Sequence, residues 1–119
     1  MQVLWISEDE DGVQMITPAQ IQQAVNLLKD AARPVRLILF GSYGRGNPRE
    51  DSDLDLLVIL SEVKNRRQEM VRLRRVLRPL RLPVDVLVVS EVAFQEWSHT
   101  PGNVLYEAAR EGIILYEGA

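Results

Sequence analysis

Apolar residues recur with a helical period near the start of the chain. Their spacing predicts a helix that begins after Thr17 and ends near Ala32, before Pro34. Thr17 and Gln20 match a capping box, in which each side chain accepts a hydrogen bond from the other residue's backbone N–H, and Pro18 is tolerated at the first helical position. The apolar face of this helix consists of Ile21, Ala24, Val25 and Leu28.

A second helical period follows Ser61, a favourable N-cap residue, and Pro79 limits its end. Its apolar stripe consists of Val63, Met70, Leu73, Leu77 and Leu80. Residues 61–81 contain eight basic side chains against two acidic ones, whereas the whole chain has a net charge of −3. An acidic body that carries one basic helix suggests a surface oriented toward a partner.

Four apolar runs predict β-strands, at residues 35–40, 54–60, 84–89 and 113–116. Two shorter helices, capped by Ser90 and by Gly102 or Asn103, are expected between the third and fourth strands, and Gly112 is the expected C′ residue of the last helix. The order predicts one α/β (α+β) domain over residues 1–119, with a small mixed sheet of about four strands and helices packed on it. Residues 1–16 give only a weak strand or hairpin pattern and are treated as an N-terminal extension.

Three aspartates interrupt the second and third of these apolar runs. Asp53 and Asp55 are two positions apart, so they project from the same face of their strand while Leu54 points to the other. Asp85 lies in the next strand, and if the two strands are neighbours the three carboxylates form one cluster. Carboxylates that stay ionised at such positions favour a bound cation, and oxygen ligands favour magnesium or manganese over zinc. Such a cluster is able to hold two metal ions, an arrangement suited to displacement at phosphorus.

The first strand ends abruptly at Gly41-Ser42. Gly41, with Gly44 and Gly46 shortly after it, would let backbone N–H groups approach phosphate oxygens, and the Ser42 hydroxyl adds a donor. Further contacts to a bound nucleotide are expected from three residues of the same loop: Arg45 and Arg49 as partners of the phosphates, and Tyr43 as an exposed ring that stacks on the base or contacts a partner.

Composition removes several classes of function. The 119 residues are 46% apolar and 26% charged, as in a globular domain, and they contain no cysteine, which excludes thiolate catalysis and sulfur-based zinc sites. The N-terminus has no basic region of a signal peptide, and no apolar stretch approaches the roughly 18 residues of a membrane span. We therefore expect a cytoplasmic protein with no membrane contact.

The complete pattern resembles a known family. Gly41-Ser42, ten residues, Asp53-Leu54-Asp55 and a later strand with Asp85 are similar to the signature of the DNA polymerase beta-like nucleotidyltransferase superfamily. The string GSYGRGNPREDSDLDLLVIL resembles the minimal nucleotidyltransferases, although Gly44 stands where that family more often has Ala.

The resemblance implies a nucleotidyltransferase fold, ATP as substrate, and Mg²⁺, with two ions expected and Mn²⁺ as a substitute. Asp53, Asp55 and Asp85 would be the metal-binding and catalytic residues, and Gly41 and Ser42 would hold the nucleotide. It also implies an antitoxin in a hetero-oligomer with a HEPN ribonuclease toxin, which transfers AMP to a tyrosine of that toxin and releases pyrophosphate.

Other interpretations start from the same residues. The chain would neutralise its partner by binding alone, through the basic helix, or it would modify a small molecule of the aminoglycoside type. Direct binding of nucleic acid is less favoured, because arginines beside an apolar stripe more often form a solvated or partner-facing surface. Asp51, Asp53 and Asp55 also match the first positions of an EF-hand loop, but Leu56 stands where that loop requires glycine.

Overall fold

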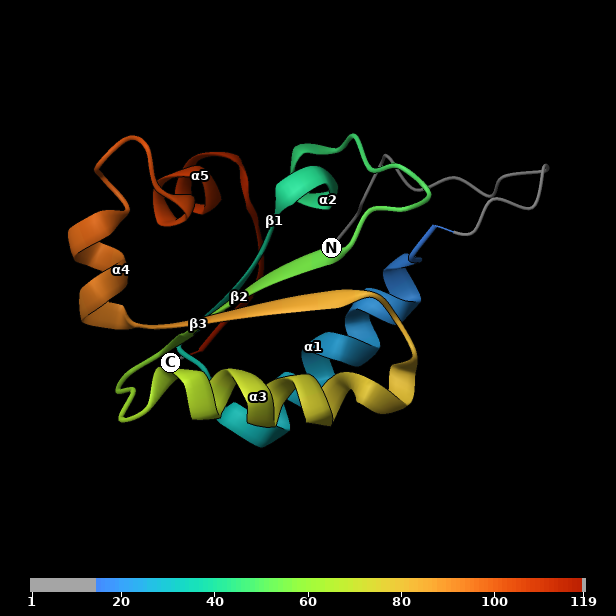
Figure 1. Cartoon of the computed structure of the whole chain (residues 1–119), viewed down its shortest axis with the longest axis horizontal. Helices are drawn as coiled ribbons and strands as arrows, with labels where there is room; N and C mark the ends of the chain where they lie inside the picture. Colours follow the sequence, from blue (N-terminus) through green and yellow to red (C-terminus); the bar gives the residue numbers. More distant parts are fainter. Residues whose placement is uncertain (1–14, 119) are drawn as a thin grey trace.

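The computed structural model describes residues 15–118 of the chain. Most of the predicted N-terminal extension, and any strand or hairpin within residues 3–14, therefore lies outside the described residues. The rest is a four-stranded sheet with helices on both faces (Figure 1). The elements in chain order are α1 (Pro18–Ala32), β1 (Arg36–Phe40), α2 (Gly41–Arg45), β2 (Leu54–Leu60), α3 (Arg66–Leu77), a 3₁₀ turn (Arg78–Leu80), β3 (Val84–Ser90), α4 (Glu91–Trp97), α5 (Val104–Glu111) and β4 (Ile113–Glu117).

The sheet is mixed, as the sequence predicted, with strand order β3-β2-β1-β4. Strand β1 pairs antiparallel with β2 and with β4, whereas β2 and β3 run parallel and are joined by a crossover through α3. The parallel pairing places the N-terminal ends of β2 and β3 side by side. It also leaves β3 as an edge strand.

Alternation along the strands divides the core between the two faces of the sheet. Helices α1 and α3 cover one face, and α4 and α5 lie on the other (Figure 1). On the α1/α3 side, the alternate residues Leu54, Leu56 and Val58 pack into the larger hydrophobic cluster. On the opposite side, Leu57 and Ile59 pack with Phe94 of α4 and Leu105 of α5. Among the residues that the structure describes, no helix is both long and apolar enough to span a membrane.

Local sequence signals placed the start of α1 correctly but placed the start of α3 too early. The capping box of α1 is present, with the Thr17 hydroxyl accepting from the Gln20 N–H at 3.2 Å and Gln20 Oε1 accepting from the Thr17 N–H at 2.9 Å. The basic helix starts later than predicted, at Arg66 rather than just after Ser61. Asn65 is its N-cap, because its Oδ1 accepts a hydrogen bond from the Gln68 N–H at 3.1 Å. Ser61 belongs to the connection that leaves β2.

Gly112 ends α5 as expected, but for a different reason. Its φ of −74° lies outside the left-handed region that usually favours glycine at a helix end. Instead, a Cβ at this position would overlap with the backbone oxygen of Ala108 and with the side chain of Ile38. Space between α5 and β1, rather than backbone conformation, therefore requires a glycine here.

Candidate active site

Helix α2 forms where the sequence analysis expected a loop. It is a single short turn that begins at Gly41, directly after β1, and ends at Arg45. Its C-cap is Gly46, whose N–H donates to the backbone oxygens of Ser42 and Tyr43. Gly46 has a φ of +80°, in the left-handed region. The Gly-rich composition concealed this helix, because glycine in a helix interior is unfavourable by about 1 kcal/mol relative to alanine.

Gly41 brings this turn against Asp55. The antiparallel register of β1 and β2 pairs Phe40 with Asp55, so the next residue, Gly41, lies over the Asp55 side chain. A Cβ at Gly41 would overlap with Oδ2 of Asp55, and its φ of +68° is unfavourable for any other residue. Two independent constraints therefore require glycine at this position.

The first turn of α2 lacks a side-chain cap in the described part of the chain, since its N-cap residue is Phe40. The first N–H groups of a helix have no partner within the helix, and such groups readily bind anionic oxygens. Ser42 is partly buried within this turn. Contact of Gly41 and Ser42 with phosphate stays a prediction for this turn.

The aspartates lie together at the N-terminal ends of the parallel strands. Asp55 and Asp85 are direct partners in the β2–β3 register, and Asp53 precedes β2 by one residue. The pKa of Asp55 is raised from 3.8 to about 6, first by burial, then by the negative charges of Asp85 and Asp53, while Arg45 lowers it. Burial and the two neighbouring negative charges both disfavour the ionised Asp55 carboxylate, and a bound cation would relieve this cost.

Asp85 differs from the sequence-based expectation. It is exposed, and its Oδ1 accepts from Arg74 Nη2 at 2.8 Å in an ion pair. Among the residues that the structure describes, no three Asp, Glu, His or Cys side chains are grouped so that they could hold a metal ion. Asp55 and Asp85 are therefore neighbours as expected, but the predicted three-carboxylate metal cluster is not formed within residues 15–118, and Asp85 contacts an arginine instead.

The oxygen-only donor set fits a divalent metal ion of the magnesium type. Asp53 and Asp55 would hold it, since they lie two positions apart at the N-terminal end of β2 and the negative charge of Asp53 contributes to the raised pKa of Asp55. Asp85, on the neighbouring strand, would join them once its carboxylate leaves Arg74.

The loop residues behave differently from one another. Arg45 is close enough to Asp55 to influence its pKa, as a phosphate partner at this site should be. Arg49 has an exposed side chain, and its backbone forms a tight turn with Ser52, whose hydroxyl accepts from the Arg49 N–H at 2.8 Å.

The expectation of an exposed ring at Tyr43 is wrong. Its side chain is only 1% exposed, because the helical turn of α2 directs the ring into the core. Its hydroxyl accepts a hydrogen bond from the Ile16 N–H at 3.1 Å and contacts Met15 Sδ at 3.9 Å. Tyr43 therefore ties α2 to the segment that leads into α1.

Several arginines of the basic helix α3 form contacts within the chain, where the sequence analysis expected a surface for a partner. Arg74 pairs with Asp85, Arg72 binds the Ala31 backbone oxygen at 2.9 Å and pairs with Glu69, and Arg66 Nε donates to the Val88 backbone oxygen at 2.8 Å. Sequence reasoning missed Arg74 as a site residue. The sequence does indicate it: α3 ends at Leu77 and β3 begins at Val84, a short connection that brings the end of the helix near Asp85.

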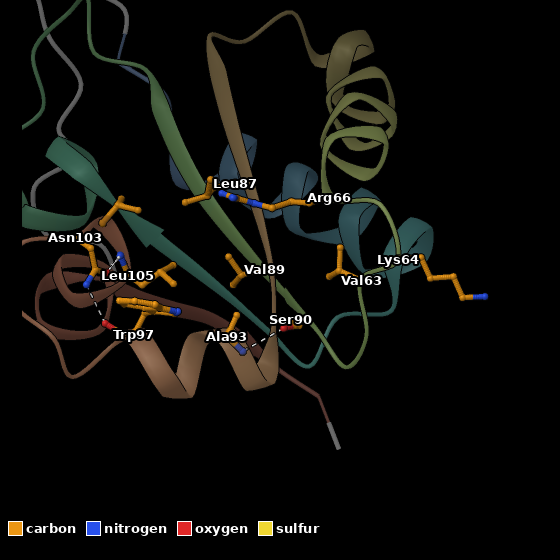
Figure 2. A pocket seen from close by; sticks show the side chains of 11 residues that line it. Val63, Lys64, Arg66, Leu87, Val89, Ser90, Ala93, Trp97, Asn103 and Leu105 are labelled. Carbon is orange, nitrogen blue, oxygen red and sulfur yellow. Dashed lines mark hydrogen bonds between the residues drawn. The ribbon is translucent and has the colours of Figure 1, made fainter.

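A pocket of about 480 Å³ lies at the other end of β3. Figure 2 shows Arg66 reaching toward β3 and Lys64 pointing away to solvent, with Trp97 of α4 below Leu105 of α5. The predicted site residues, all within the described part of the chain, do not line this pocket. It is a hollow separate from the aspartates.

Comparison with known proteins agrees with this geometry. The family described as polymerase beta, nucleotidyltransferase, matches residues 22–119, which include every predicted site residue. A Methanocaldococcus jannaschii protein named "Putative protein adenylyltransferase" is 46% identical over 41 residues, which are 33% of this chain and 41% of that protein. The chain thus matches less than half of the length of this relative.

Two solved structures extend the comparison. One, described as a "putative minimal nucleotidyltransferase", is 33% identical, with a TM-score of 0.55 over 86% of this chain and 98% of that one. The other is a tri-AMPylated Shewanella oneidensis HEPN toxin in complex with MNT antitoxin, matched at 19% identity and a TM-score of 0.51 over 84% of this chain and 71% of that one, a likeness of fold. The family match over most of the chain and the Gly41–Asp55 geometry lead to one assignment: this chain belongs to the polymerase beta nucleotidyltransferase family.

Proposed function

We propose that this chain is a metal-dependent nucleotidyltransferase that transfers AMP from ATP to a tyrosine hydroxyl of a HEPN-type partner protein. The observation that carries the proposal is the close approach of Gly41 to Asp55, because it joins a turn that would bind phosphate directly to a carboxylate. Asp85 on the neighbouring strand, with Asp53 just before β2, supplies further negative charge at the same place.

The reaction assigns a role to each element. The N–H groups of the α2 turn and the Ser42 hydroxyl bind the distal phosphates of ATP, and Arg45 neutralises part of their charge. Mg²⁺ held by Asp53 and Asp55 would supply charge neutralisation at the α-phosphate. The acceptor oxygen forms a bond to the α-phosphorus, the bond from that phosphorus to the bridging oxygen breaks, and pyrophosphate leaves. Asp85 accepts the proton of the acceptor hydroxyl.

The protein acceptor is supported by similarity. The related Shewanella oneidensis complex contains an AMPylated HEPN toxin bound to an MNT antitoxin, and the Methanocaldococcus jannaschii protein matched over 41 residues is named a protein adenylyltransferase. The proposal therefore includes a hetero-oligomer of this chain with a HEPN-type toxin as its working assembly. In that role AMP transfer would inactivate the toxin.

The test is transfer of radiolabelled AMP. Purified chain, Mg²⁺ and ATP labelled at the α-phosphate are incubated with a HEPN-type protein encoded in the same genome, and the label on that protein is measured. We expect labelling by the wild type and its loss in Asp53→Asn and Asp55→Asn. Asp51→Asn is the matched control, because Asp51 lies in the exposed turn before β2. Full labelling by the Asp53→Asn, Asp55→Asn double variant would reject the proposal.

A second candidate function is neutralisation by binding alone. The specific observation in its favour is exposed apolar surface on α4, where Val92 is 66% exposed and Trp97 is 54% exposed, and on α5, where Val104 is 39% exposed. This mechanism needs no carboxylates at the sheet edge. Cells arrested by the toxin should then be rescued as well by Asp53→Asn as by the wild type, whereas the catalytic proposal predicts rescue by the wild type only.

A further inference from the structure

Arg74 reaches the active site from the opposite side of the sheet. Helix α3 packs on the face occupied by Val86 and Val88, and alternation along β3 directs Asp85 to the other face. Because β3 is the edge strand, the long Arg74 side chain can pass around it, and Nη2 lies 2.8 Å from Asp85 Oδ1. The Arg74 guanidinium therefore contacts Asp85, one of the three carboxylates, although α3 lies in the helix layer on the opposite face of the sheet.

This contact places a permanent positive charge where a metal ion would compete for the same oxygen atoms. An arginine remains protonated at all relevant pH values, so Asp85 stays compensated when no metal is present. Within residues 15–118, Asp55 forms no ion pair, whereas Asp85 already has a cationic partner in Arg74. Of the two facing aspartates, Asp55 and Asp85, only Asp85 is therefore paired with a positive charge in the described part of the chain.

We propose that Arg74 is a positioning residue that holds Asp85 away from the metal ion, and that the metal must displace this arginine to recruit Asp85. The inference rests on the proposed function for the identity of the site as a metal site. Arg74 then lowers the affinity of the free protein for divalent cations. Both side chains of the pair are about half exposed, and pairs of this kind correspond to at most about a five-fold change in an equilibrium constant.

The test is a titration of the full chain with Mn²⁺ in the absence of nucleotide, with free Mn²⁺ counted by electron paramagnetic resonance. We expect Arg74→Gln to bind Mn²⁺ about two- to five-fold more tightly than the wild type. Arg75→Gln is the matched control, since it removes the same charge from the next, exposed position of α3 and should leave the affinity unchanged. Circular dichroism spectra of all variants check that each has folded.

A double-variant cycle separates direct contact from a general charge effect. In the Asp85→Asn background, Arg74→Gln should no longer change the Mn²⁺ affinity, because the carboxylate for which they compete is gone. Equal tightening in both backgrounds, or equal affinity of the wild type and Arg74→Gln, would overturn the role of Arg74 while leaving the metal site intact. Failure of the wild type and Arg74→Gln alike to bind Mn²⁺ would overturn both this inference and the metal-dependent function.

Discussion

Replacement of Asp55 by asparagine should stabilise the metal-free protein at neutral pH. The native pKa of Asp55, about 6, is above the value of 3.8 expected in the unfolded chain, so the native state binds more protons between these two pH values. Its stability therefore decreases as the pH rises through this window, and the full cost is present above it. Asparagine carries no charge at any pH and avoids this cost.

The size of the effect follows from the displacement of the pKa. At 1.36 kcal/mol per pKa unit, a rise from 3.8 to about 6 corresponds to about 3 kcal/mol. The side chain is partly exposed, and solvent screening reduces the expected gain to about 1 to 1.5 kcal/mol. The gain should be absent below pH 3.8 and complete above pH 6.

Urea unfolding at a series of pH values, with a chelator present, measures the difference between Asp55→Asn and the wild type. Asp51→Asn is the control, because Asp51 is exposed and is not among the charges that shift the Asp55 pKa. A difference that does not depend on pH, or a variant that is less stable than the wild type at neutral pH, would refute the electrostatic account of this site.

Three further substitutions, two of them paired with a control substitution, test single contacts by urea unfolding. Gly41→Ala should lose about 2 kcal/mol or more through left-handed strain and overlap with Asp55, whereas Gly102→Ala, with φ +95° and open space around it, should lose only the strain of about 1 to 2 kcal/mol; equal losses would contradict the overlap. Tyr43→Phe should lose about 1 to 2 kcal/mol by leaving the Ile16 N–H unsatisfied and should retain the affinity for ATP, and a large loss of affinity would indicate that the Tyr43 hydroxyl contacts the nucleotide. Asn65→Ala should lose about 1 kcal/mol as the N-cap of α3 and Ser61→Ala almost nothing, the reverse of what a helix capped by Ser61 requires.

Features set by neighbouring residues were predictable from the sequence. The capping box of α1 depends on Thr17 and Gln20, three positions apart, and it forms as expected. The bounds of β2 follow from an uninterrupted apolar run with polar residues before it. Whether Asp55 and Asp85 are neighbours stayed conditional on the strand order, although one helix joins the two strands, a connection typical of parallel neighbours.

Features set by packing were not predictable in this way. The burial of Tyr43 depends on how the α2 turn is rotated against the core, which the spacing of glycines does not determine. The ion pair of Arg74 depends on the side of β3 at which α3 packs and on β3 being an edge strand. Many arginines in one helix hid the one that reaches the site, since composition does not distinguish Arg74 from its exposed neighbour Arg75.

The most direct test of the central claim compares ATP labelled at the α-phosphate with ATP labelled at the γ-phosphate, using the same chain, metal and HEPN-type acceptor. Nucleotidyl transfer predicts that the acceptor retains the α label, that the γ label appears only in pyrophosphate, and that Asp53→Asn abolishes both. Transfer of the γ label to the acceptor, or α labelling that persists without Asp53 and Asp55, would contradict the account.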